Sequence, residues 1–347
     1  MKTKLSILVA VFCSVAPYSY SQTTAVSGQS ASKQTPPGGI FDPLGLISPS
    51  EHGQLTTLGT GFSFTEGPAV DRHGNVFFTD QPNDKIYRWD AGTGDITLFL
   101  QGTGRANGMA FDRDGTLIAC SDLHGEVWKI YPDGSHVVLV NNYGGKLLNG
   151  PNDVWINPVT GGMYFTDPIF PRPYWDDTDL RKQTWPPTHS EQAPVGKGGY
   201  VYYLPPGGAA LVRVTTEAMG WESDGWPNGI VGTPDGRKLY VNKWTGDSKG
   251  GTWTFDINPD GTLSNMRKFT EWGGDGMSMD ESGNVYISNG QGVMAFDPNG
   301  NNILMITLGT SGTNNTFAGR NDKLLFITDA MGRVSGIKMS VKGVPGL

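Results

Sequence analysis

Short apolar stretches alternate with turn-forming residues along most of this chain, from about residue 58 to residue 340. The stretches are rich in β-branched and aromatic residues, which favour strands, and glycine, proline and aspartate in the intervening turns favour hairpins. Further strands, such as 85–89 and 126–130, follow the most regular ones. We therefore predict an all-β protein, and its most regular strands are expected at 76–80, 116–120, 163–167, 238–242, 284–288 and 324–328.

Each hairpin opens with a side chain that carries an oxygen atom. The successive spacings of these openings are 41, 45, 76, 47 and 40 residues. Repeats of about 40 to 50 residues are typical of propeller blades, and the long spacing contains an insertion at 168–198 in the third repeat. An accidental series of hairpins in a β-sandwich would not keep a common register. The sequence thus predicts a six-bladed β-propeller whose repeats open at Glu66, Asn107, Asn152, Asn228, Asp275 and Asn315.

The inner strands of a propeller line one channel, so these six side chains are expected to meet near the axis at one mouth. All six offer oxygen and none is histidine or cysteine. Such a set suits Ca²⁺, with Mg²⁺ or Mn²⁺ as alternatives. Taken singly, each position could instead cap a turn, but six aligned positions favour a divalent metal site.

Other polar residues are expected at the same mouth, because the second strand of each blade returns there. Asp167 ends such a strand, and His124 follows another. His124 could also be a simple turn residue before Gly125. The candidate substrate-binding residues are Asn107, Asn152, Asp167, Asn315 and His124.

Composition and charge restrict the location and the partners of the protein. Lys2 and Lys4 precede a short apolar run, which predicts a signal peptide at 1–21 and a secreted or periplasmic protein. A flexible leader is expected at 22–50 and the propeller at 51–347. Removal of the signal would leave Cys120 as the one cysteine, so no internal disulfide can form. A net charge of −7 gives nucleic acid or an anionic membrane no basic surface to bind, and the number of subunits is not predicted.

Several motifs, in order, resemble the gluconolactonase and regucalcin (senescence marker protein) family. The resemblance covers residues 58 to 340. It implies a divalent metal, often calcium, with Glu66, Asn152, Asn228 and Asp275 as ligands and Asp275 also in catalysis. Asn152 could bind the metal through water or contact the substrate. The motifs are Thr65-Glu66-Gly67-Pro68, Pro151-Asn152-Asp153-Val154, Thr166-Asp167-Pro168, Pro227-Asn228-Gly229 and Asp275-Gly276-Met277.

The resemblance predicts a metal-dependent hydrolase that opens a lactone, most naturally a sugar lactone such as gluconolactone. Asp275 would take the proton from the attacking water. Two other functions share the scaffold: a phosphotriesterase of the diisopropyl-fluorophosphatase type, and an exported calcium- or sugar-binding propeller without catalysis. One departure bears on the substrate, because Gly150 stands where regucalcin-like members have a substrate-binding arginine.

Overall fold

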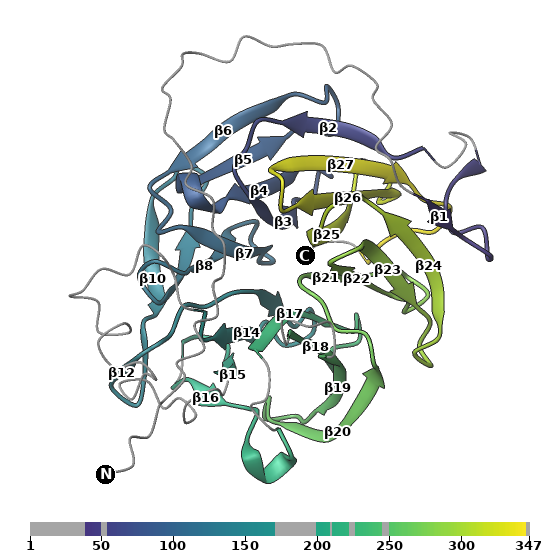
Figure 1. Ribbon diagram of the computed structural model, residues 1–347. Coiled ribbons are helices and arrows are strands. Elements are labelled where there is room, and N and C mark those ends of the chain that lie inside the picture. Colours follow the sequence, from purple (N-terminus) through teal and green to yellow (C-terminus); the bar gives the residue numbers. More distant parts are fainter. Residues whose placement is uncertain are drawn as a thin grey trace, which may run out of the picture. The chain divides into compact units, whose positions relative to one another are not determined.

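The computed structural model describes residues 39–49, 54–170, 199–208, 210–221, 226–244 and 250–344. Within these residues, six antiparallel sheets of four or five strands stand around a central axis (Figure 1). The innermost strands of neighbouring sheets contact one another in chain order, and the last contacts the first, so the ring is closed. The predicted six-bladed, all-β propeller is confirmed. The predicted signal peptide and most of the insertion at 168–198 lie outside the described residues.

The first three blades each run outward from the axis in chain order. A small hairpin, β11 (Asn142–Tyr143) and β12 (Lys146–Leu147), precedes the third blade. The strands are, in blade one, β3 (Thr65–Val70), β4 (Val76–Asp80), β5 (Lys85–Trp89) and β6 (Ile96–Gln101); in blade two, β7 (Ala106–Phe111), β8 (Leu117–Ser121), β9 (Glu126–Ile130) and β10 (His136–Val140); and in blade three, β13 (Val154–Ile156), β14 (Met163–Pro168), β15 (Gly199–Leu204) and β16 (Val212–Arg213).

The last three blades follow the same order, except that N-terminal strands complete the last two. The described helices are two short 3₁₀ turns, η2 (Gln81–Asn83) and η3 (Glu217–Met219), neither long and apolar enough to cross a membrane. The strands are, in blade four, β17 (Trp226–Gly232), β18 (Lys238–Trp244), β19 (Gly251–Ile257) and β20 (Leu263–Thr270); in blade five, β21 (Met277–Met279), β22 (Val285–Asn289), β23 (Gly292–Phe296), β24 (Asn302–Thr307) and β1 (Ile40–Phe41); and in blade six, β25 (Gly312–Ala318), β26 (Leu324–Asp329), β27 (Arg333–Lys338) and β2 (Thr56–Thr60).

Part of the predicted flexible leader is ordered. β1 pairs with β24 at the outer edge of blade five. Ile47 is buried and bridges Met339, and Asp42 accepts hydrogen bonds from the backbone of Leu46 and Ile47 at 2.8 Å. Residues 39–49 are therefore not a free tether, because β1 pairs with blade five and Leu46 and Ile47 are buried, although Ile40, Phe41 and Leu44 stay exposed.

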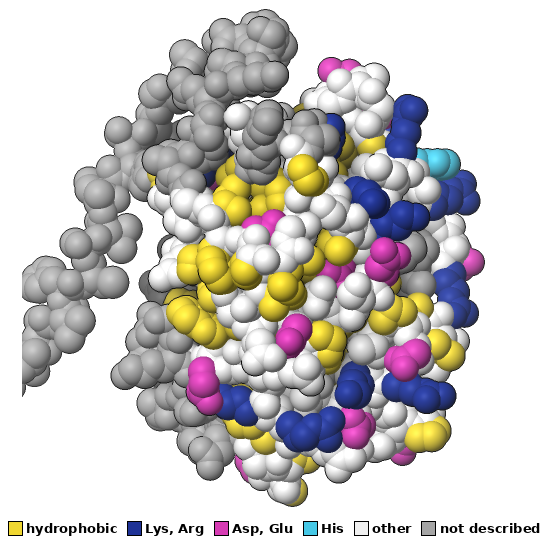
Figure 2. Space-filling model, turned by 90° about the vertical axis from the view of Figure 1, so that its right-hand side faces the viewer, with side chains coloured by type: hydrophobic (Ala, Val, Ile, Leu, Met, Phe, Trp, Pro, Cys, Tyr) yellow, Lys and Arg dark blue, Asp and Glu magenta, His cyan; other side chains and the backbone are white. Residues whose placement is uncertain are grey.

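The hydrophobic core lies between adjacent blades rather than in one central mass. One cluster joins blades one and two, another joins blades four and five, and a third joins blades one and six. On the surface in Figure 2, basic and acidic side chains are interspersed rather than separated. The packing between the faces of neighbouring blades holds the six inner strands close together, so that their first residues meet at the axis.

An apolar cavity of about 400 Å³ occupies the far part of the channel. Its lining includes Met109, Phe111, Trp155 and Phe317 from three blades. Val344, near the C-terminus, also lines it, and its backbone N–H donates to the carbonyl of Met279 at 3.0 Å. The polar residues that open the inner strands therefore lie at one end of the channel, with apolar side chains behind them.

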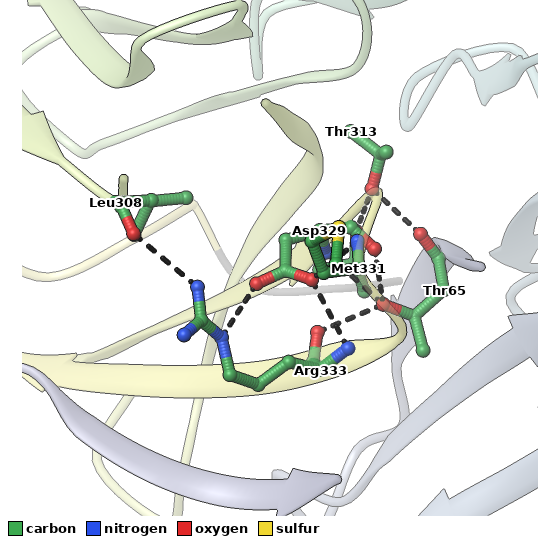
Figure 3. Close-up of polar contacts among 7 residues, drawn as sticks. Thr65, Leu308, Thr313, Asp329, Met331 and Arg333 are labelled. Atoms are coloured by element: carbon green, nitrogen blue, oxygen red, sulfur yellow. Dashed lines mark hydrogen bonds and ion pairs between the residues drawn. The ribbon is translucent and has the colours of Figure 1, made fainter. Parts of the chain in front are cut away.

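Blade six is tied to blade one by a polar network (Figure 3). The Thr65 hydroxyl lies within hydrogen-bond distance of the carbonyls of Asp329 and Arg333, at 3.1 and 2.8 Å. The Thr313 hydroxyl donates to the Thr65 carbonyl at 2.6 Å. The Arg333 guanidinium lies 2.7 Å from the carboxylate of Asp329, whose side chain is only 3% exposed. This network closes the ring between its first and last inner strands.

The Arg333 side chain makes a testable contribution to stability. Arg333→Met is expected to lower the free energy of unfolding by about 3 kcal/mol, because it leaves a buried carboxylate without its cation. Arg88→Met is the control, since the pair of Arg88 with Asp90 is about one-third exposed, and a loss of no more than about 1 kcal/mol is expected. Urea unfolding measures the free energy of unfolding of both variants. Equal losses would contradict the stabilising role of the buried Arg333–Asp329 pair.

Candidate metal centre

The inner strands of neighbouring blades lie very close together where they open. Most of the opening residues are followed by a glycine. Neighbouring blades touch at these glycines, with no room for a side chain. An added Cβ on Gly67, Gly108 or Gly229 would lie about 2 Å from an atom of the next blade. Such approaches require glycine. The recurring Glu-Gly, Asn-Gly and Asp-Gly pairs therefore mark the narrow end of the channel.

A β-bulge lies at or directly after the opening residue of the inner strand in blades one, two and four. In β7, Ala106 pairs with Ser121 and Met109 pairs with Ala119, so the inner strand has one extra residue at Asn107. The same shift occurs after Glu66 in β3 and after Pro227 in β17. Bulges re-aim side chains next to functional sites. The bulges thus free Asn107 and Asn228 from the regular alternation of the strand, whereas Glu66 still pairs with Thr79 just before its bulge.

Hydrogen bonds between blades define equivalent positions around the ring. The N–H of Gly108 donates to the carbonyl of Asn152 at 2.6 Å, and that of Gly229 donates to the carbonyl of Asp275 at 3.1 Å. The equivalent bond to blade six runs from Gly276 to the carbonyl of Thr313, at 2.7 Å. Thr313 therefore holds the ring position of blade six, two residues before the predicted Asn315.

The side chain of Asn315 is directed at the neighbouring blade five rather than into the ring. Its amide donates to the hydroxyl of Ser288 at 2.9 Å and to the carbonyl of Tyr286 at 3.3 Å. The residue that reaches the ring is Asn314, whose amide donates to Glu66 Oε2 at 3.0 Å. Sequence reasoning missed Asn314 because three polar residues stand in a row, and only the contacts between blades select among them.

Three acidic side chains interact at the centre of the ring. Glu66 is 3% exposed, and its pKa is raised well above the usual value, first by burial and then by the negative charge of Asp275. Burial, followed by the charge of Glu66, raises the pKa of Asp153 to about 7. Buried like charges repel one another. A bound cation would offset this repulsion.

The amide oxygens at the ring provide an independent test of whether a metal fits. Among the described residues, Oδ1 of Asn107 and Oδ1 of Asn228 are buried without any hydrogen-bond partner. A buried oxygen without a partner is costly, and it needs a water or an ion. These two oxygens lie at the ring positions next to Glu66 and Asp275. The donor set therefore fits a hard divalent cation.

Acidic groups alone would not hold such an ion. No three His, Cys, Asp or Glu side chains within the described part of the chain are arranged to hold a metal. Ligands must therefore include the Asn amides, as expected for Ca²⁺ and not for Zn²⁺. Glu66, Asn152 and Asn228 are buried, whereas Asp275 is partly exposed. Among these four predicted ligands, Asp275 is the one that solvent reaches most easily.

Asp167 has a different position from the one predicted for a substrate contact. It is fully buried. Its carboxylate accepts hydrogen bonds from the backbone N–H groups of Asn149 and Gly150, both at 3.0 Å, and from the Asn149 amide at 3.0 Å. Asp167 therefore holds the loop that leads into Asn152.

His124 lies on the surface of blade two. Its ring is exposed and stacks on Trp128, with ring centres 5.7 Å apart. Trp128 also stacks on His136, with ring centres 3.8 Å apart. These contacts place His124 against β9, the third strand of its blade, and not in the ring of oxygens.

Two features at the mouth bear on the substrate. A Cβ on Gly150 would lie 2.2 Å from Oδ1 of Asp122, so the chain has no room for an arginine at this position without a shift. Phe170, at the start of the insertion, packs on Trp226 and Trp244 with ring centres 5.6 and 5.8 Å away. Trp226 lies two residues before Asn228, so these aromatic side chains lie beside the oxygen-bearing residues of the channel mouth.

The fold and the site together define a six-bladed propeller with oxygen-bearing side chains at one end of its channel. The chain belongs to the SMP-30/gluconolactonase/LRE-like family, whose model matches residues 64–331. This confirms the family resemblance found in the sequence.

The chain is similar to several known proteins. It is 26% identical over 302 residues to a gluconolactonase of Zymomonas mobilis, covering 79% of this chain and 78% of that protein. A solved gluconolactonase from Xanthomonas campestris is 27% identical, with a TM-score of 0.73 over 90% of this chain and 99% of that one. The calcium-binding protein regucalcin from Agrobacterium tumefaciens shares the fold at 18% identity, with a TM-score of 0.64 over 84% of this chain and 95% of that one.

Proposed function

We propose that the protein is a metal-dependent lactonase that opens a sugar lactone such as gluconolactone. Membership of the family and the relatives named gluconolactonase support the enzyme class. One observation carries the metal dependence. The amide oxygens of Asn107 and Asn228 are buried in the ring that contains Glu66, and neither has a hydrogen-bond partner among the described residues. The signal-like N-terminus supports action outside the cytoplasm.

Glu66, Asn152, Asn228 and Asp275 would hold the ion, and Ca²⁺ suits this set best. When bound, a divalent cation polarises the lactone carbonyl and stabilises the negative charge that develops on its oxygen. Asn107 offers a further oxygen to the ion or to a substrate hydroxyl. The proton transfers would be carried out by side chains of this chain.

Asp275 is the proposed general base. It is partly exposed, so water reaches it, whereas Glu66 is buried behind it. Its carboxylate would accept the proton of the attacking water as the ring carbonyl is attacked, and would return a proton when the ring oxygen leaves. The amide of Asn242 donates to the Asp275 backbone carbonyl at 2.6 Å, which fixes the main chain at this position.

Removal of the metal provides the test of this function. Treatment with a chelator followed by dialysis is expected to abolish the opening of glucono-lactone, and added Ca²⁺ is expected to restore it. The assay follows acid release with a pH indicator, after subtraction of spontaneous opening without enzyme. The panel also contains aromatic and acyl lactones and a phosphotriester.

Full activity after chelation would refute the metal dependence. Turnover of the phosphotriester without turnover of any lactone would favour the phosphotriesterase. Saturable Ca²⁺ binding without any hydrolysis would favour a binding protein.

A further inference from the structure

Asn314 joins acidic groups of two other blades. Its Nδ2 donates to Glu66 Oε2 at 3.0 Å, and the same amide lies near enough to Asp153 to oppose the rise in the pKa of that carboxyl. Glu66 comes from blade one, Asp153 from the start of blade three, and Asn314 from β25 in blade six. A primary amide has two N–H donors. Asn314 can therefore serve both carboxyl groups at once.

The orientation of this amide is fixed by the main chain. The backbone N–H of Asn315 donates to Oδ1 of Asn314 at 2.8 Å. Rotation of the amide by half a turn would lose this bond and direct its oxygen at the two carboxyl groups. Asn314 is 5% exposed, so water is not available to replace the lost partners. The amide nitrogen must therefore face Glu66.

The space for Asn314 is provided by the residue after Asp275. A Cβ on Gly276 would lie 1.8 Å from Cγ of Asn314, so the amide is packed directly against this glycine. The N–H of Gly276 donates to the carbonyl of Thr313 at 2.7 Å. Asn314 is thus held in place beside both Glu66 and the chain segment that carries Asp275.

We propose that Asn314 is a positioning residue of the metal centre, which holds Glu66 in the arrangement that binds the ion. This role rests on the proposed function, because it presupposes that Glu66 is a metal ligand. Asn314 offers its donors to the acidic groups and its oxygen to the backbone, so it acts through Glu66 and not as a ligand itself. Hydrogen-bond partners of metal ligands typically change metal affinity by about 10- to 100-fold when they are lost.

The test compares Asn314→Leu with a matched variant, Asn284→Leu. Asn284 is also buried and also donates to a carboxylate, that of Asp280 at 2.8 Å, but it lies at the turn between β21 and β22, at the other end of the channel. Both variants remove an amide donor from a buried carboxylate, so both are expected to lower stability. Calorimetric titration with Ca²⁺ alone, on the full chain, is expected to show an affinity about 10- to 100-fold lower for Asn314→Leu and unchanged for Asn284→Leu.

Asn314→Ser keeps a small polar side chain and serves if the leucine variant does not fold. It is expected to weaken Ca²⁺ binding in the same direction. Wild-type Ca²⁺ affinity in a folded Asn314 variant would overturn the positioning role, as would an equal loss in Asn284→Leu. Lactone turnover is measured separately, so Ca²⁺ binding without lactone opening in the wild type would refute the proposed function and leave the role of Asn314 standing.

Discussion

Asp275→Asn is expected to lower kcat for lactone opening by about 10²- to 10⁴-fold, the range typical of a lost general base. The amide is nearly the same size as the carboxylate and still offers an oxygen to the ion. It cannot accept a proton near neutral pH. Asp275 is the acidic ring residue that is partly exposed, so no other predicted ligand has equal access to the attacking water. Initial rates at saturating Ca²⁺ and lactone measure the effect.

The control for this variant is Asp235→Asn. Asp235 lies in the exposed turn between β17 and β18, where it accepts a hydrogen bond from the N–H of Arg237 at 3.1 Å. Its kcat is expected to equal that of the wild type. Retention of more than about a tenth of the activity by Asp275→Asn would rule out its role as the base, since a lost base costs at least about 100-fold.

Glu66→Gln is expected to weaken Ca²⁺ binding by more than about 100-fold. The loss should exceed the 10- to 100-fold typical of groups that only support a ligand, because a charged ligand disappears from the ring. The introduced amide oxygen can still accept from the N–H of Gly67, which lies 2.6 Å from Oε2 in the wild type, so the local backbone should be retained. Calorimetric titration measures the affinity, and circular dichroism checks the fold.

Glu281→Gln provides the charge-matched comparison. Glu281 is exposed in the turn at the other end of blade five, so the variant removes the same charge far from the ring. Its Ca²⁺ affinity is expected to stay within about twofold of the wild type, because exposed charges beyond about 10 Å are screened. If both variants lost affinity equally, the effect of Glu66 would reflect net charge and not coordination.

The fold was predictable because residues close together in the sequence define each repeat. The turns, the strands rich in β-branched and aromatic residues and the recurring opening residues all depend on neighbours along the chain. The pairs Glu66-Gly67, Asn228-Gly229 and Asp275-Gly276 also carry information about the axis, because glycine there permits contact between blades. Five of the six predicted opening positions coincide with equivalent places in the ring.

The features that the sequence did not predict have a common physical cause, because each depends on contacts between segments that are distant in the chain. The choice of Thr313 for the ring position and the role of Asn314 follow from hydrogen bonds to Gly276 and Glu66 in other blades. Likewise, the leader at 39–49 contains several apolar residues, of which Leu46 and Ile47 are buried against residues near position 339 whereas Ile40, Phe41 and Leu44 stay exposed. No local pattern reports such contacts.

The central claim is that oxygens from separate blades bind one divalent ion at the narrow end of the channel. Crystals grown with Ca²⁺ and measured at a long X-ray wavelength test it through the anomalous signal of the ion. A single peak about 2.3–2.6 Å from side-chain oxygens of Glu66, Asn228 and Asp275 is the predicted result. An empty ring under saturating Ca²⁺, or a peak bound elsewhere on the molecule, would contradict the claim.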